Sequence, residues 1–174
     1  REETTKEILS QLKPAFKPDG VITAGNSSQI SDGAAALLLV SEDILNKFNL
    51  EPIAKIKSMA VVGTDPVLML SGPIPATRKA LDQAKLKPED INLAEINEAF
   101  SSVVGAWRKE FPEINYENVN ANGGSIAIGH PLGATGARLM TNLIHEMKRN
   151  KLKYGLQAIC EGGGTANATI VELV

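Results

Sequence analysis

The sequence predicts an α/β fold in which a mixed β-sheet is layered between helices. Strand-like and helical patterns alternate along the chain, and the 43% hydrophobic and 22% charged residues suit a globular core. No segment repeats at a fixed period, which excludes a solenoid. The 174 residues can build one sizeable core but hardly two. We therefore expect one soluble globular domain.

Local sequence patterns predict where each helix and strand lies. Residues 2–12 are charged and predict a short exposed helix, whereas the apolar run 34–40 predicts a buried strand. The last two strands are close enough in sequence to pair antiparallel. The further elements are helices over 42–48, 75–85, 98–111 and 134–149, and strands over 53–62, 91–96, 154–160 and 167–174.

Charge and cysteine content narrow the function. The net charge of −2 leaves no excess of Lys and Arg to neutralise phosphates, so a nucleic-acid partner is not expected. The single Cys160 excludes an intrachain disulfide and a multi-cysteine metal site, and we expect no bound metal. A reducing compartment follows, namely the cytoplasm or an organelle matrix. No apolar run is long enough to span a membrane.

The chain opens without Met and without an apolar leader, which indicates a fragment or a processed piece. Residues 1–30 are expected to be the remnant of a preceding loop region and a linker. Residues 31–174 then form the main domain.

Three polar or reactive positions lie at expected element ends, where sites are commonly built. Asn97 follows a strand and precedes a helix, so it and Glu98 could simply cap that helix. His130 lies in a Gly-rich loop before Pro131, which favours extended backbone there; it could act as a base or be structural.

Cys160 is the third candidate. Free cysteines are commonly inert and buried, but three glycines follow almost directly at 162–164 and allow close backbone approach. With His130 in the same chain, thiol chemistry is the leading hypothesis. A phosphate-binding loop is not expected, because neither GxGxxG nor GxxxxGK[ST] occurs.

Five sequence blocks, taken together and in order, resemble the signature motifs of the thiolases. The likeness extends over essentially the whole chain, but it corresponds only to the C-terminal part of a thiolase, so a thiolase-like C-terminal domain is expected. The blocks are Thr23-Ala24-Gly25-Asn26-Ser27-Ser28 with Asp32-Gly33-Ala34-Ala35-Ala36, Gly72-Pro73-Ile74-Pro75-Ala76, Asn97-Glu98-Ala99-Phe100, Gly129-His130-Pro131 and Cys160-x-Gly162-Gly163-Gly164.

The resemblance implies a catalytic set. Thiolases cleave a 3-ketoacyl-CoA with CoA, or run the reverse Claisen condensation, through a nucleophilic Cys that this chain lacks and that lies in the N-terminal half. His130 would activate that nucleophile and polarise the thioester carbonyl, and Asn97 would hold a water in the same oxyanion hole. Cys160 would be the acid/base, and the Gly162 N–H would join a second oxyanion hole.

The resemblance also implies how substrate is bound. Ala24 and Ser28 match positions that touch the pantetheine arm of CoA, and Phe100 matches a position lining the acyl pocket. CoA would be a co-substrate, with no covalently bound cofactor. Glu161 departs from many thiolases; strand alternation predicts that it points away from Cys160.

Two alternatives remain at this point. The chain could be a non-catalytic acyl-CoA-binding or assembly module with a thiolase-like fold. Condensing enzymes of fatty-acid synthesis share the architecture, but generally pair two histidines with the nucleophile.

As a thiolase of β-oxidation or wider fatty-acid metabolism, the chain would partner the N-terminal thiolase half and form a homodimer or homotetramer when full length. Alone, we expect it to be inactive and to expose an apolar face.

Overall fold

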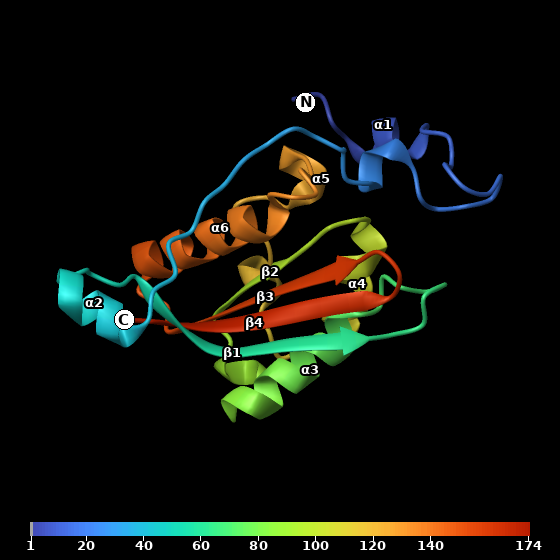
Figure 1. Ribbon diagram of the computed structural model, residues 1–174. Coiled ribbons are helices and arrows are strands. Elements are labelled where there is room, and N and C mark those ends of the chain that lie inside the picture. Colours follow the sequence, from blue (N-terminus) through green and yellow to red (C-terminus); the bar gives the residue numbers. More distant parts are fainter. Residues whose placement is uncertain (1) are drawn as a thin grey trace.

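A computed structural model describes residues 2–174 and shows a mixed four-stranded sheet (Figure 1). Its strands are β1 (Ala54–Gly63), β2 (Leu93–Ile96), β3 (Tyr154–Glu161) and β4 (Thr165–Leu173), in the order β1-β4-β3-β2. β4 pairs antiparallel with both β1 and β3, and β2 pairs parallel with β3. The expected mixed sheet and the antiparallel closing hairpin are confirmed.

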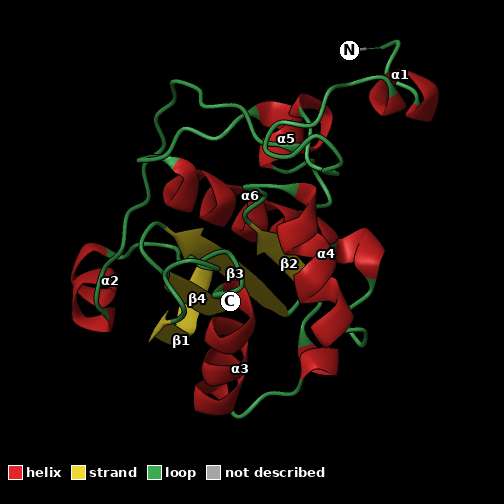
Figure 2. Cartoon of the chain, turned by 90° about the vertical axis from the view of Figure 1, so that its right-hand side faces the viewer, coloured by secondary structure: helices red, strands yellow, loops and turns green. Residues whose placement is uncertain are grey.

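Helices cover both faces of this sheet (Figures 1 and 2). α3 (Pro73–Ala84) and α4 (Ser101–Glu110) lie on one face, and α6 (Thr135–Asn150) lies on the other. The shorter elements are α1 (Lys6–Ser10), η1 (Ala24–Asn26), α2 (Glu42–Phe48), η2 (Pro88–Asp90), η3 (Tyr116–Asn118) and α5 (Ser125–Ile128). The layered arrangement is the one that alternation predicts.

The main core lies between the sheet and the α3 and α4 layer. Small side chains such as Ala80 of α3 and Ala168 of β4 are fully buried there and let helix and sheet approach closely. Trp107 of α4 is also fully buried and donates its indole N–H to Thr77 Oγ1 of α3 at 2.9 Å. This bond satisfies both polar groups and fixes the two helices to each other.

The α6 face forms a smaller core. Leu143 and Met147 of α6 pack there with Leu93 and Val171 of the sheet. Gly155 lies directly beneath Met147, and a Cβ at this position would overlap the Met147 sulfur. A larger side chain here would have to displace the Met147 side chain, so glycine lets α6 lie close to the strand that leads to Cys160.

Some sequence-based element boundaries are wrong. Residues 34–40 form no strand; they run extended over the α6 layer, and Leu38 is 82% exposed (Figure 1). A strand needs a hydrogen-bonded neighbour, and this run has none among residues 2–174. The first helix covers only Lys6–Ser10, and the helix expected from residue 98 begins at Ser101.

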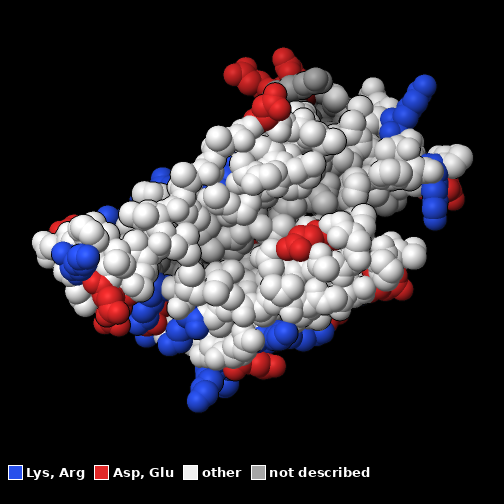
Figure 3. Space-filling model, viewed as in Figure 1, with Lys and Arg blue, Asp and Glu red and all other residues white. Residues whose placement is uncertain are grey.

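Large apolar side chains remain exposed outside these cores. Figure 3 shows a broad face with few charged groups. The exposed apolar residues include Ile30, Leu38, Leu39, Met59, Val61, Val67 and Leu68. Such exposure agrees with the expected apolar face of the isolated chain.

Candidate active site

Asn97 lies at the end of β2, beside the last residues of β3. Parallel pairing places Ile96 opposite Ala158, and the Asn97 N–H donates to the Ala158 carbonyl at 3.0 Å. Because parallel strands end at the same edge, Asn97 and Cys160 are brought together there. The Asn97 side chain is 1% exposed, and its Oδ1 accepts from Ser125 Oγ at 2.8 Å.

Asn97 does not cap the following helix. Phe100 occupies the N-cap position of α4 and makes no side-chain cap, so the capping alternative is wrong. The Asn97 side chain is bonded instead to Ser125 of α5, 28 residues away. A simple cap would face the first N–H groups of its own helix.

Glu98 likewise lies outside the first turn of α4. Its carboxylate accepts from the Ile126 N–H and from Asn120 Nδ2, each at 3.0 Å. Gly124 packs against this carboxylate so closely that a Cβ would overlap it. Glu98 therefore fixes the Gly-rich loop that leads to His130.

Cys160 is a free, buried thiol near the end of β3. Burial raises the pKa of this thiol, whereas a backbone hydrogen bond and the Asn97 side chain lower it. The Glu161 charge is a smaller influence that raises the same pKa. On balance the pKa is raised, so Cys160 is a protonated thiol at neutral pH and can donate a proton.

Glu161 faces its own hairpin. Its carboxylate accepts from Thr165 Oγ1 at 2.9 Å and from Asn167 Nδ2 at 2.5 Å. These bonds agree with the orientation that strand alternation predicts.

The glycines after Cys160 form the turn between β3 and β4. Gly164 has φ +85°, and a Cβ there would lie 2.7 Å from the Thr64 carbonyl oxygen, so only glycine fits. Gly162 is exposed at the first turn position.

His130 is half-buried, and its protonation pattern follows from its neighbours. Nδ1 lies 2.6 Å from Thr135 Oγ1, and that hydroxyl donates to the Pro131 carbonyl at 2.9 Å. Since the hydroxyl proton is already used, Oγ1 must accept from Nδ1–H, which leaves the lone pair on Nε2. Burial, and then the charge of Arg138, lower the pKa of His130, so the ring is neutral near pH 7.

The segment expected to touch CoA bridges the two loops. Ser28 donates both its backbone N–H and its Oγ to the Ala99 carbonyl, at 3.1 and 3.2 Å, and the His130 N–H donates to the Gln29 carbonyl at 2.7 Å. Ala24 is exposed in η1, four residues upstream. Ser28 therefore lies against the Asn97–Phe100 loop.

Phe100 is half-buried beside this segment. Its ring meets that of Phe16 edge to face, with centroids 5.7 Å apart. An aromatic pair therefore lies next to the candidate site.

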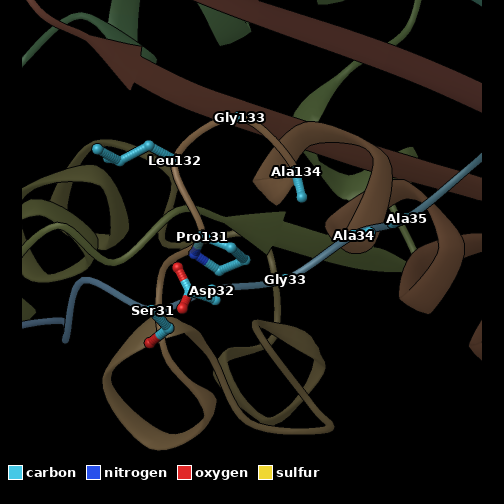
Figure 4. A pocket seen from close by; sticks show the side chains of 9 residues that line it. All are labelled: Ser31, Asp32, Gly33, Ala34, Ala35, Pro131, Leu132, Gly133 and Ala134. Atoms are coloured by element: carbon cyan, nitrogen blue, oxygen red, sulfur yellow. The ribbon is translucent and has the colours of Figure 1, made fainter.

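A cavity of about 380 Å³ is lined in part by the residues that follow His130 in the chain (Figure 4). It is formed by two segments that run past each other, Ser31–Ala35 and Pro131–Ala134. The close-up shows the Asp32 carboxylate beside Pro131, where the two segments meet.

Four further polar residues surround the site, and sequence reasoning did not single them out. Thr135 fixes the His130 tautomer, and Arg138 donates from Nη2 to Ser125 Oγ at 3.1 Å. Glu95 is 1% exposed, and burial raises its pKa to about 8, although Arg138 opposes this shift. No local spacing signals these roles, because each depends on a partner from another loop or helix.

Comparisons with known proteins agree with this geometry. The family model of the thiolase C-terminal domain matches residues 50–173, and that of the thiolase N-terminal domain matches residues 1–43. The chain belongs to the thiolase family. The expected division of the chain at residue 30 stays a prediction.

Named relatives are similar along nearly the whole chain. It is 52% identical over 170 residues to the steroid 3-ketoacyl-CoA thiolase FadA6 of Mycobacterium tuberculosis, covering 98% of this chain and 41% of that protein. It is 49% identical to the 3-ketoacyl-CoA thiolase of Bacillus subtilis, covering 99% and 44% respectively. The chain thus spans less than half the length of these relatives.

Solved structures share the fold. The acetyl-CoA acetyltransferase of Bacillus anthracis superposes with a TM-score of 0.96 at 45% identity, covering all of this chain and 44% of that one. A human mitochondrial 3-ketoacyl-CoA thiolase in complex with CoA gives a TM-score of 0.91 at 38% identity, with the same coverage. No helix within residues 2–174 is long and apolar enough to cross a membrane.

Proposed function

We propose that this chain supplies the Asn–His–Cys part of a thiolase active site, for the CoA-dependent cleavage of a 3-ketoacyl-CoA or the reverse condensation. The observation that carries the proposal is the complementary protonation state of His130 and Cys160. His130 presents an unprotonated Nε2, and Cys160 is a protonated thiol beside Asn97. A neutral base and a thiol acid are what thioester exchange requires.

Cleavage begins outside this chain, at the nucleophilic Cys of the N-terminal thiolase half. Nε2 of His130 takes the proton of that thiol, and the thiolate attacks the 3-keto carbon. The C2–C3 bond then breaks, leaving an acyl thioester on the enzyme and the enolate of acetyl-CoA. Cys160 donates its proton to C2 of the enolate, which completes acetyl-CoA and leaves a thiolate at Cys160.

The second half-reaction returns the enzyme to its starting state. The Cys160 thiolate takes the proton of incoming CoA, whose sulfur attacks the acyl thioester and releases the nucleophilic Cys, which recovers its proton from His130. Asn97 would hold a water that, with His130, stabilises the thioester oxyanion, and the Gly162 N–H would serve the acyl-enzyme. Losing one such donor typically costs about 10²–10³ in rate.

Substrate contacts are proposed for the segment between the two loops. Ser28 and exposed Ala24 would line the pantetheine arm of CoA, and Phe100 would line the acyl pocket. Their support is the bonding of this segment to both the Ala99 carbonyl and His130. The CoA complex of the human relative supports CoA itself as the co-substrate.

Assembly and location are part of the same proposal. The exposed apolar side chains support burial against the N-terminal thiolase half and, at full length, a homodimer or homotetramer. The free thiol suits the cytoplasm, or an organelle matrix in a eukaryote. Light scattering of the isolated chain should show dimers or aggregates, and a strictly monomeric chain would contradict this.

The test compares this chain alone with a chimera. The chimera joins the N-terminal portion of the Bacillus subtilis relative to this chain. With acetoacetyl-CoA and CoA, we expect no thiolysis by the chain alone, clear thiolysis by the chimera, and a loss of about 10²-fold or more in an Asn97→Ala chimera. A folded chimera that binds acyl-CoA without turnover would instead indicate a non-catalytic binding module.

A further inference from the structure

Two consecutive hydrogen bonds connect Arg138 to Asn97 through Ser125. Arg138 Nη2 donates to Ser125 Oγ at 3.1 Å, and Ser125 Oγ donates to Asn97 Oδ1 at 2.8 Å. Ser125 is fully buried, and Asn97 is 1% exposed. The Ser125–Asn97 bond is therefore shielded from water that could replace it, and the Arg138–Ser125 bond is partly shielded.

The direction of these bonds follows from the donors available. A guanidinium has only donors, so Ser125 Oγ must accept from Arg138 and can give its single proton only to Asn97. The amide atom that faces Ser125 must then be the oxygen. The amide nitrogen is turned the other way, toward the site.

Cys160 is a neighbour of Asn97, because the Asn97 N–H donates to the Ala158 carbonyl, two residues before Cys160 on the paired strand. Asn97 Nδ2 is buried and makes no hydrogen bond of standard geometry to another group within residues 2–174. The Asn97 side chain nevertheless lowers the pKa of the Cys160 thiol, as a donor facing the sulfur does. If the amide were reversed, its oxygen would face the sulfur and destabilise the thiolate.

Arg138 lies in a partly buried polar environment, where its Nε and Nη1 have no hydrogen-bond partner among residues 2–174. Its Nε and Nη1 are buried, and the Glu95 carboxylate, whose Oε2 is also buried, lies within range of its charge. Glu95 of β2 and Gln157 of β3 are register partners beneath α6, and Gln157 Nε2 donates to the Gly136 carbonyl at 3.1 Å. The guanidinium thus lies over a buried polar patch of the sheet.

We propose that Ser125 and Arg138 are positioning residues that fix the orientation of the Asn97 amide, with its NH₂ group toward Cys160 and its oxygen away. The inference rests on the proposed function in one respect, namely that this orientation of the Asn97 amide matters for catalysis. The orientation itself is a property of this chain, and it can be tested without any turnover.

The test uses the fact that this chain contains one cysteine. With ¹³C at the cysteine Cβ, a single NMR signal reports the titration of Cys160 in the whole 174-residue chain. In Ser125→Ala the amide loses the donor that orients it, and we expect the pKa of the thiol to rise by roughly one unit. Ser58→Ala is the matched control, because it removes another buried hydroxyl, which donates to the Ala80 carbonyl at 2.8 Å, and it should leave the titration unchanged.

A second cycle separates positioning from general disturbance. In an Asn97→Ala background, Ser125→Ala should no longer move the Cys160 titration. Arg138→Met should raise the pKa of the Cys160 thiol more with Asn97 present than with Ala at position 97. The direct effect of the Arg138 charge on the thiol is the same in both backgrounds, so the difference between them reports positioning through Asn97. Far-UV circular dichroism selects the folded variants, and the Arg138 cycle gives the answer if Ser125→Ala does not fold.

The titrations test the positioning role, and the chimera tests its effect on catalysis. Equal shifts in both backgrounds, or no shift in Ser125→Ala, would overturn the positioning role. In the chimera, Ser125→Ala should lower kcat about tenfold with little change in KM. A chimera without activity would count against the proposed function alone, because the titration still decides the orientation of Asn97.

Discussion

Nδ1 of His130 and Oγ1 of Thr135 lie 2.6 Å apart, and the same hydroxyl donates to the Pro131 carbonyl at 2.9 Å. The threonine hydroxyl is thus both donor and acceptor, and it holds the imidazole in the tautomer whose Nε2 can accept a proton. The Ser125 hydroxyl likewise accepts from Arg138 and donates to Asn97. One hydroxyl behind each polar group fixes the direction of its hydrogen bonds.

Replacing Thr135 by Val should remove the acceptor for His130 Nδ1–H. We expect a loss of about tenfold in kcat in the chimera and of about 1 kcal/mol in the free energy of unfolding, because a half-buried donor is left unpaired. Thr141→Val is the control, since Thr141 Oγ1 donates to the Ala137 carbonyl in the same i−4 geometry without touching the site. Equal effects of both substitutions on kcat would contradict the tautomer argument.

The acid limb of the pH–rate profile should report His130. Burial and the Arg138 charge lower the pKa of this residue below 6.5, the ordinary pKa of histidine. In the chimera, kcat/KM should therefore fall only when the pH is below 6.5. Removing the nearby cation in Arg138→Met should raise the pKa of His130 and move the acid limb to higher pH. Arg149→Met, in the last turn of the same helix, should leave the limb in place; an unmoved limb in Arg138→Met would argue against His130 as the base.

Glu95 should make the stability of the chain depend on pH. Its folded-state pKa of about 8 lies above the ordinary 4.5, so folding favours the protonated carboxyl. This contribution is fully present below pH 4.5 and is lost as pH rises through 8. Glu95→Gln keeps a neutral group, so urea unfolding should become less pH-dependent across this window, by a few kcal/mol. Glu117→Gln, at an exposed position, controls for the lost charge, and a Glu95→Gln curve parallel to the parent would refute the assignment.

Much of the fold can be predicted from sequence because local patterns and burial agree. The helical spacing over 75–85 and 134–149 and the β-rich runs over 53–62 and 154–160 each find the neighbour that they need. The run 34–40 is apolar enough for a strand, but pairing is not a local property, and within residues 2–174 no strand pairs with it. The prediction of a buried strand is therefore wrong on both counts, since the run forms no strand and most of its side chains are exposed.

The candidate site divides in the same way. Asn97, His130 and Cys160 stand in short motifs with adjacent glycines, and these motifs are visible in the sequence. Thr135, Ser125 and Arg138 act through the direction of hydrogen bonds between a loop, a helix and a strand end. Nothing in their local sequence distinguishes them from ordinary polar residues of α5 and α6.

The central claim is that Cys160 is the acid/base of the active site, and its replacement in the chimera tests this most directly. With acetoacetyl-CoA and CoA, Cys160→Ala should lower kcat by roughly 10²–10⁴-fold, the range typical for loss of a positioned acid/base, while KM changes little. Gly162 and the rest of the turn remain intact, so binding should persist. A folded Cys160→Ala chimera whose kcat stays within a few fold of the parent would contradict the account.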